Sequence, residues 1–263
     1  MKICENFYTL QGEGKYVGEP SYFIRTSGCI LRCKFCDTKH SWDIHNGLEI
    51  SDKDDISKFC SNNLNNLDKT TRIVFTGGEP LMYNNLDIIF DMIEHFRSVG
   101  FYRFMFETTM IFGIEDFMKS NLINNLLFLK NLLLLDEDIC FSVSPKLNLE
   151  SYVGLNVKEE DVFSFYLFGL NSIDRLINTN FKDNIFFKLV YQKETEQSIL
   201  KFIDRVPYEY FRESFYLMPY TPVPYNSDRY LQSKIDCFEF CKKNSVRYSP
   251  RIHVDIFQLQ REK

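Results

Sequence analysis

A predicted strand runs directly into a cysteine-rich loop at Tyr22–Thr38, which reads YFIRTSGCILRCKFCDT. The aromatic and β-branched residues of Tyr22–Thr26 favour a strand. The loop after it carries Cys29, Cys33 and Cys36. Parallel α/β proteins build their sites from loops at the carboxyl ends of strands. This stretch therefore predicts an α/β protein whose site begins at the end of the first parallel strand.

The alternation of strand and helix continues along the chain. Predicted strands follow at Arg72–Phe75, Phe101–Phe106, Ile139–Val143, Ile185–Val190 and Phe215–Met218. Predicted helices lie at 51–66, with Ser51 as N-cap, at 86–99, ended by Gly100, and at 114–135, 161–177, 194–204 and 227–243, before an extended segment at 247–257. About six strand–helix units fit, fewer than the eight of a closed barrel. The pattern favours a parallel sheet with outer helices, as a barrel, partial or full, or an open doubly wound sheet.

Polar clusters follow five of these strands. Besides the cysteine loop they are Thr76–Pro80, Glu107–Thr109, Ser142–Lys146 and Pro219–Tyr220. Because the carboxyl ends of parallel strands open on one side, the clusters should meet there. This arrangement favours an enzyme. No linker rich in Gly, Ser or Pro divides residues 1–263, which predicts a single domain.

Composition excludes several classes of protein. The 31 basic and 36 acidic residues give a net charge of −5, so no basic surplus favours direct binding to nucleic acid. The start lacks a basic segment followed by an apolar one, and the longest aliphatic run is Leu132–Leu135, which predicts neither a signal peptide nor a membrane span. We therefore expect a cytoplasmic chain whose eight cysteines are reduced.

The spacing C-x3-C-x2-C at Cys29, Cys33 and Cys36 is the strongest chemical signal. Four-iron clusters usually take four cysteines, so a cluster held by these three would leave one iron open to another ligand. A structural zinc site that adds His40 is the main alternative on spacing alone, and unligated thiols are a third. The other five cysteines lack ligand spacing and are expected to be structural.

The cysteine spacing with Phe35 before the third cysteine resembles the signature of the radical S-adenosylmethionine superfamily, and Gly77–Pro80 resembles its Gly-Gly-Glu motif. The resemblance implies a [4Fe-4S] cluster whose open iron binds S-adenosylmethionine. Reduction of the cluster then cleaves this cofactor to a 5′-deoxyadenosyl radical. Gly77 and Gly78 would let the backbone approach the ligand closely.

Further motifs resemble one family of that superfamily, 7-carboxy-7-deazaguanine synthase. They are Phe7–Gly14, Gly18–Arg25, Cys36–Thr38, Ser41–Asp43, Thr76–Pro80, Glu107–Thr108, Ser144–Lys146 and Pro250–His253. The family implies a partial (βα)6-type TIM barrel and a lyase of the queuosine-type 7-deazapurine pathway. It converts 6-carboxy-5,6,7,8-tetrahydropterin to 7-carboxy-7-deazaguanine by hydrogen abstraction, ring contraction and loss of ammonia. A homodimer and a flavodoxin or ferredoxin as reductant are also implied.

The resemblance also assigns roles to individual residues. Cys29, Cys33 and Cys36 would hold the cluster, and Thr38 would bind a Mg²⁺ ion shared with the substrate. The residues implied to contact S-adenosylmethionine are Phe35, Asp37, Gly78, Glu79, Ser144, Pro145 and Lys146. Those implied to contact the pterin are Leu10, Gln11, Gly12, Glu13, Arg25, Thr76 and His253, with Glu13 accepting from ring N–H groups and Arg25 pairing with the carboxylate.

Some residues depart from the family pattern. Arg251 stands where the family implies glutamine, residues 111–138 are rich in Asn and Leu and carry no motif of the family, and residues 218–224 are rich in proline. Three alternatives therefore stay open: an activase that installs a glycyl radical on a protein, a relative that makes an amide-bearing deazapurine, and a zinc-stabilised binding module.

Overall fold

The computed structural model describes residues 1–82, 85–110, 127–128, 130–132, 135, 138–155, 157–158, 161–164, 166–167, 184–206 and 212–258. The helices expected at 114–135 and 161–177 fall largely outside these residues. The remaining strands and helices can be compared with the sequence one by one.

One open sheet of nine strands organises the described part of the chain. Its order is β3–β1–β2–β4–β5–β6–β7–β8–β9. The strands are β1 (Lys2–Leu10), β2 (Pro20–Thr26), β3 (Leu48–Glu49), β4 (Arg72–Gly77), β5 (Arg103–Thr108), β6 (Asp138–Val143), β7 (Ile185–Tyr191), β8 (Phe215–Pro219) and β9 (Arg247–Tyr248). All neighbours from β2 to β9 are parallel, whereas β1 runs antiparallel to β2 and β3. The predicted α/β class and parallel sheet are confirmed, and the full-barrel alternative is wrong because β3 and β9 end the sheet on opposite sides.

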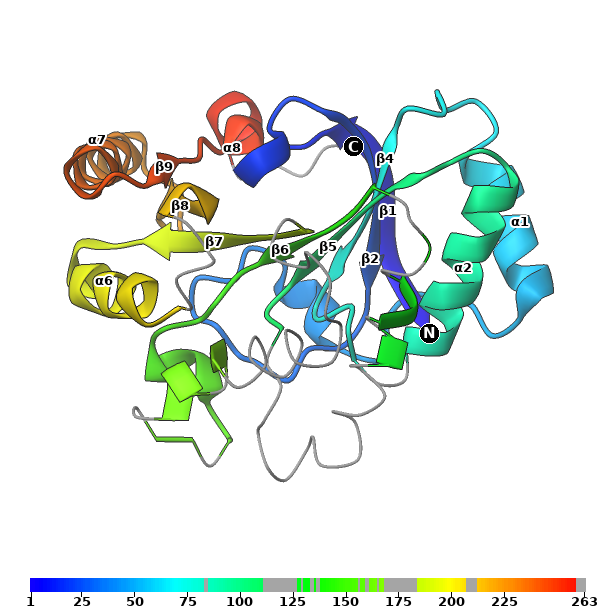
Figure 1. The fold of residues 1–263 in the computed structure, drawn as a ribbon, viewed down its shortest axis with the longest axis horizontal. Coiled ribbons are helices and arrows are strands. Elements are labelled where there is room, and N and C mark those ends of the chain that lie inside the picture. The colour runs from blue at the N-terminus through cyan, green and yellow to red at the C-terminus, as the bar shows by residue number, and fades with distance from the viewer. Residues whose placement is uncertain are drawn as a thin grey trace.

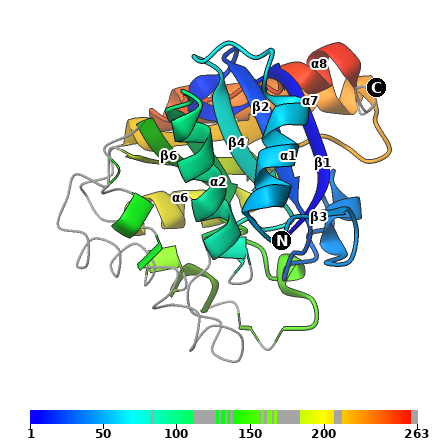
Figure 2. The ribbon, with the colours of Figure 1, turned by 90° about the vertical axis from the view of Figure 1, so that its right-hand side faces the viewer.

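Four of the described helices cover one face of this sheet with residues of the main core. They are α1 (Lys53–Asn63), α2 (Leu86–Ser98), α6 (Glu196–Arg205) and α7 (Ser227–Asn244), whereas the short helix α8 (Ile252–Phe257) contributes no residue to that core. Seen from the side, α1 and α2 lie in front of β2 and β4, while α6 and α7 lie toward the other end of the sheet (Figures 1 and 2). The main core joins helix residues such as Ile89 and Phe202 to strand residues such as Phe75 and Phe187. No helix in the described residues combines the length and the apolar character that crossing a membrane requires.

The opposite, inner face of the sheet follows from strand parity, because successive side chains of a strand point to opposite faces. A second apolar cluster takes one residue from each of six parallel strands, namely Phe23, Val74, Met105, Cys140, Phe186 and Tyr216. Two positions further along four of these strands, the same parity places Arg25, Thr76, Glu107 and Lys188 at the carboxyl ends. Toward the other end, the fully buried Arg72 pairs with Glu19 and Asp138. Along the strands of the inner face, the apolar cluster therefore lies between polar groups at the carboxyl ends and polar groups at the amino ends.

Three local expectations are wrong. β1 was not anticipated because KICENFYTL has no regular alternation, and it forms by pairing along β2 from Leu10 opposite Pro20 to Ile3 opposite Thr26. The N-cap of α1 is Asp52 rather than Ser51, because the Asp52 carboxylate accepts the Asp55 N–H at 2.9 Å. The closing segment is extended for only two residues and then forms α8, whose first turn bonds back to Arg251 O from Val254 N and Asp255 N, both at 2.9 Å.

Candidate active site

A cavity of about 810 Å³ opens at the carboxyl ends of the parallel strands. All five polar clusters expected there contribute to its wall, which confirms that they meet on one side of the sheet. Most residues implied by the resemblance line it: Leu10, Gln11, Gly12, Glu13, Arg25, Cys29, Cys33, Phe35, Cys36, Asp37, Thr38, Thr76, Gly78, Ser144, Lys146 and His253. Glu79 and Pro145 are buried behind this wall.

The cysteine loop presents three thiols to the cavity. Cys33 is buried, whereas Cys29 and Cys36 are half-buried. Burial, reinforced by the nearby Glu79 carboxylate, raises the pKa of Cys29 to about 12. Binding of iron deprotonates cysteine ligands, so a bound cluster would offset this cost of burial. Three sulfurs on one loop beside a cavity of this size fit an iron–sulfur cluster.

The zinc alternative depended on His40 as a fourth ligand. In the structure His40 Nε2 lies 3.6 Å from Glu5 Oε2. Among the described residues, no three His, Cys, Asp or Glu side chains converge closely enough to hold a single metal ion, and this includes the three loop cysteines. A four-iron cluster has a different requirement, because each cysteine binds a different iron.

The glycine-rich turn after β4 packs against the cysteine loop. A Cβ at Gly78 would lie 2.0 Å from the Gly28 carbonyl oxygen and 2.9 Å from Cys29 Cβ. Gly77 has φ +141°, and its Cβ would lie 2.3 Å from the Thr26 carbonyl oxygen. The close approach that these glycines permit in the structure is therefore to the neighbouring strand and the cysteine loop. Glu79 N donates to Gly28 O at 2.8 Å and completes the junction.

Gly78→Ala should lower the iron content after anaerobic reconstitution by at least half. The added methyl would overlap the backbone of the cysteine loop, and backbone cannot rotate away as a side chain can. Iron per chain, measured by colorimetry, checks this expectation. Gly154→Ala is the control, because an added Cβ at Gly154 would meet nothing within 4 Å, so it tests a glycine replacement without the overlap. Equal iron content in the two variants would contradict the role of Gly78.

The Glu79 carboxylate is held by the end of the next strand. It accepts from Thr108 Oγ1 at 2.5 Å, from Thr109 N at 2.7 Å and from Thr109 Oγ1 at 2.6 Å. Further along the sheet, Lys146 Nζ donates to Ser144 Oγ at 2.6 Å, and Lys146 N donates to the Tyr166 hydroxyl at 2.7 Å. The loops after β4, β5 and β6 therefore have fixed conformations around the cavity.

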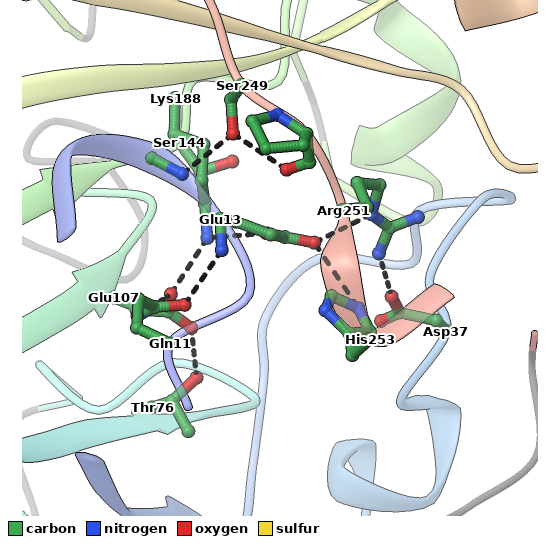
Figure 3. A network of polar contacts seen from close by, with 12 residues as sticks. Gln11, Glu13, Asp37, Thr76, Glu107, Ser144, Lys188, Ser249, Arg251 and His253 are labelled. Atoms are coloured by element: carbon green, nitrogen blue, oxygen red, sulfur yellow. Dashed lines mark hydrogen bonds and ion pairs between the residues drawn. The ribbon is translucent and has the colours of Figure 1, made fainter. Parts of the chain in front are cut away.

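A buried ionic network, drawn in Figure 3, forms part of the wall of the cavity. Glu13 Oε2 lies 2.8 Å from Lys188 Nζ, and Glu13 Oε1 lies 2.7 Å from Arg251 Nε. Burial opposes the charge on Glu13, but Lys188 and Arg251 together hold the pKa of its carboxyl well below its usual range. The carboxylates of Glu107 and Glu13 raise the pKa of Lys188 despite its burial. Glu13 is therefore an anion that can only accept hydrogen bonds.

Glu107 extends this network across the sheet. Its Oε1 lies 2.8 Å from Lys188 Nζ and accepts from Gln11 Nε2 at 3.3 Å, and its Oε2 accepts from Thr76 Oγ1 at 3.0 Å. Residues of β4, β5 and β7 are thus joined to the loop after β1. The network binds together segments that are far apart in the sequence.

Three other residues expected to bind substrate, Arg25, Gly12 and His253, also lie at the cavity. Arg25 Nε pairs with Glu5 Oε2 at 2.7 Å, and its guanidinium lies 6.0 Å from the centre of the Phe7 ring. A Cβ at Gly12 would lie 2.1 Å from His253 Nδ1, so the absence of a side chain at Gly12 is what lets His253 approach this loop.

Two members of the network, Lys188 and Thr221, were not predicted from the sequence, and the Thr221 hydroxyl accepts a hydrogen bond from Arg251 Nη1 at 2.6 Å. Arg251 stood out only as a departure from the family pattern. A signal for Lys188 was present, because it is the single charged residue in the apolar run Ile185–Tyr191. Buried lysines are rare unless they are paired, which points to a carboxylate partner. The partners of Arg251 could not be read from the chain, since Glu13 is 238 residues away.

Comparison with known proteins gives an independent view of this chain. Residues 10–135 match the family model described as "4Fe-4S single cluster domain". The 7-carboxy-7-deazaguanine synthase of Buchnera aphidicola is 44% identical over 33% of this chain and 46% of the relative. The 7-carboxy-7-deazaguanine synthase of Pyrobaculum aerophilum is 40% identical over 32% of this chain and 35% of the relative. That of Halobacterium salinarum is 42% identical over 35% of this chain and 34% of the relative. The matches to these three relatives span between about a third and a half of their length.

The fold has a counterpart among solved structures. The crystal structure of QueE from Escherichia coli superposes with a TM-score of 0.54 at 20% sequence identity, over 94% of this chain and 92% of that one. This likeness supports the α/β architecture with its mostly parallel sheet. The curated sequences that the chain resembles at the residue level are 7-carboxy-7-deazaguanine synthases.

Proposed function

We propose that this protein is a radical S-adenosylmethionine enzyme that converts 6-carboxy-5,6,7,8-tetrahydropterin to 7-carboxy-7-deazaguanine, as a lyase of the 7-deazapurine pathway. The observation that carries the proposal is the shared cavity. The three cysteines line one side of it, and the buried anion Glu13 lies on another. Similarity to 7-carboxy-7-deazaguanine synthases and to a [4Fe-4S] domain supports it. The open sheet with its outer helices is consistent with the partial (βα)6-type barrel of that superfamily.

In this proposal Cys29, Cys33 and Cys36 hold the [4Fe-4S] cluster at the mouth of the cysteine loop. When bound, the reduced cluster and S-adenosylmethionine would supply the one-electron chemistry that removes a hydrogen atom from the substrate. The chain positions the cofactor through residues around the cluster: Phe35, Asp37, Gly78, Glu79, Ser144, Pro145 and Lys146. Apart from the buried Glu79 and Pro145, these residues line the cavity.

The part of the cavity wall around Glu13 suits a planar, nitrogen-rich ring. Glu13 would accept from the N–H groups of the pterin, because an ionised carboxylate offers acceptors alone. Arg25 would pair with the substrate carboxylate through guanidinium nitrogens other than the Nε that faces Glu5. The remaining contacts would come from Leu10, Gln11, Gly12, Thr76 and His253. Thr38 would supply an oxygen ligand to a Mg²⁺ ion, which prefers such ligands.

The burial of the network favours a small-molecule substrate over the activase alternative. Glu13 and Lys188 expose 8% and 5% of their surface, and both lie inside the cavity. An activase needs its polar recognition groups where a partner protein can reach them. A homodimer and a flavodoxin or ferredoxin as electron donor belong to the proposal through the resemblance.

Anaerobic turnover tests the proposed function directly. The reconstituted protein is incubated with reductant, S-adenosylmethionine, Mg²⁺ and 6-carboxytetrahydropterin, and the products are identified by mass spectrometry. We expect a brown protein containing iron and sulfide, and formation of the carboxylated deazapurine. A colourless zinc protein, or no deazapurine from a fully loaded cluster, would contradict the proposal. A product with the mass of the amide would instead support the amide-forming alternative.

Arg25→Ala should leave the cluster intact and reduce kcat/KM for the pterin by about 100-fold, the effect of removing a charged partner of a carboxylate. Arg25 lines the cavity, and its side chain is 13% exposed. Iron content and steady-state kinetics separate the two effects. Arg212→Ala is the matched control, because Arg212 is half-exposed and pairs with Asp204. Kinetics of Arg25→Ala equal to those of the control would remove Arg25 from the site.

A further inference from the structure

Arg251 joins three separate segments of the cavity wall. It precedes α8, and 8% of its surface is exposed. Its guanidinium donates from Nε to Glu13 Oε1 at 2.7 Å, from Nη1 to Thr221 Oγ1 at 2.6 Å and from Nη2 to Asp37 Oδ2 at 2.6 Å. All three nitrogens of the planar fork are used, each toward a different segment. Lysine, with its single nitrogen on a flexible stem, could not reproduce this geometry.

The partners of Arg251 lie on the two sides of the proposed reaction. Glu13 belongs to the loop that would bind the pterin, and Asp37 directly follows Cys36 in the cysteine loop. The backbone adds a further link, since Ile252 N donates to Gly12 O at 3.1 Å. A rigid, permanently charged group therefore connects the cofactor side of the cavity to the substrate side (Figure 3).

We propose that Arg251 is a positioning residue that ties the cysteine loop to Glu13 and so fixes the separation between the cofactor and the substrate. The inference rests on the proposed function. It adds a residue that neither the resemblance nor the similarity to known synthases assigns, at a position where the family pattern implies glutamine. Glutamine has a shorter, neutral side chain and could not form two ion pairs at once.

The contact between Arg251 and Asp37 of the cysteine loop is tested on the cluster-loaded, full-length protein without S-adenosylmethionine or substrate. Under anaerobic conditions an iron chelator is added, and loss of visible absorbance gives the rate at which the loop opens. Arg251→Gln should release iron about tenfold faster, as expected for loss of a charge-assisted hydrogen bond. Asp37→Asn should act similarly, and the double variant should release iron no faster than either single variant, because both break the same link.

The contact between Arg251 and Glu13 is tested through the affinity for 6-carboxypterin, an oxidised analogue of the substrate. The fluorescence of this ligand reports its binding between pH 5 and 7 with Mg²⁺ present. Loss of one cation should raise the pKa of Glu13, so the affinity of Arg251→Gln should fall more steeply toward pH 5 than that of the wild type. Arg251→Lys keeps the charge and should restore the wild-type pH profile, but not the slow iron release. The charged and titratable groups that face Glu13 are Lys188 from β7, Arg251 and His253 from the C-terminal segment, and, through these cations, Glu107 and Asp37.

Two controls separate this role from a loss of folding. Arg212→Gln makes the same substitution at a half-exposed position and should match the wild type in both measurements. Thermal unfolding of each variant shows whether it is folded at the assay temperature. Iron release and pterin binding of Arg251→Gln within twofold of the wild type would overturn the proposal. So would equal behaviour of the lysine and glutamine variants, since a merely structural arginine predicts that result. A wild-type protein without a cluster, or one that does not bind the pterin, would count against the proposed function itself.

Discussion

Cys33→Ala is expected to yield a colourless protein without turnover. Cys33 is the most buried of the three loop cysteines, and it lines the cavity together with Cys29 and Cys36. A three-cysteine cluster already lacks one protein ligand, and removal of a second leaves two sulfurs on one loop. Visible absorbance and iron per chain after anaerobic reconstitution give the result, and product formation should fall below detection.

The matched control for this prediction is Cys60→Ala. Cys60 is a buried cysteine of α1 that packs in the main core, away from the cavity. Its replacement should cost about 1 kcal/mol of stability, because a small cavity forms, and should leave colour and turnover intact. Full iron content in Cys33→Ala, or loss of colour in Cys60→Ala, would contradict the assignment of the cluster to the loop.

Glu13→Gln should reduce kcat/KM for the pterin by about 100-fold or more. The amide is neutral, and one of its two ends is a donor, so it cannot accept from the ring N–H groups of the pterin as the carboxylate would. The substitution should also destabilise the protein by about 3 kcal/mol, since Lys188 and Arg251 lose a shared counter-ion. This value is at the low end for a broken buried ion pair, because Glu107 and Asp37 still face the two cations. Urea unfolding and steady-state kinetics measure the two effects.

The pH dependence of that destabilisation provides a second check. Because the pKa of Glu13 is lowered in the folded state, its stabilisation is fully present above the unfolded-state pKa of about 4.3 and is lost as the pH falls through the folded-state value. The difference in unfolding free energy between wild type and Glu13→Gln should therefore stay constant from pH 7 to about pH 5 and shrink at lower pH. Glu94→Gln is the control: its exposed pair with Arg97 should contribute less than about 1 kcal/mol at any pH. A difference that grows on acidification would show that Glu13 is not held ionised.

Elements with a strong local pattern could be predicted from the sequence. The aromatic and β-branched run Ile185–Tyr191 and the apolar periodicity of α2 carry enough information on their own. β1 could not be found this way, because its backbone is held by pairing with β2 and its own residues carry no regular alternation. α8 was missed for a related reason: it is a six-residue helix whose first turn depends on where Arg251 is anchored.

The candidate site shows the same division between local and long-range information. The cysteine loop is contiguous, so its spacing is visible in the sequence. The face of the sheet to which Arg25 points depends on the register of β2, which the pairing of Arg25 with Thr76 of β4 fixes in the folded chain. The environment of Glu13 is built by Lys188 and Arg251, which lie on distant segments. Contacts between such segments are properties of the folded chain, and only the unusual lysine of β7 gave a hint of them.

The ion pair between Arg251 and Asp37 also bears on the order of assembly in the cell. The cysteine loop is synthesised well before Arg251, since Asp37 precedes this arginine by 214 residues and the arginine follows β9. In a nascent chain the three thiols are therefore synthesised before the C-terminal part of the cavity wall, which includes Arg251. Delivery of iron and sulfide before translation reaches Arg251 would meet an open, solvent-accessible loop. A cluster inserted at that stage would lack the contact between Arg251 and Asp37 that holds the loop in the folded chain.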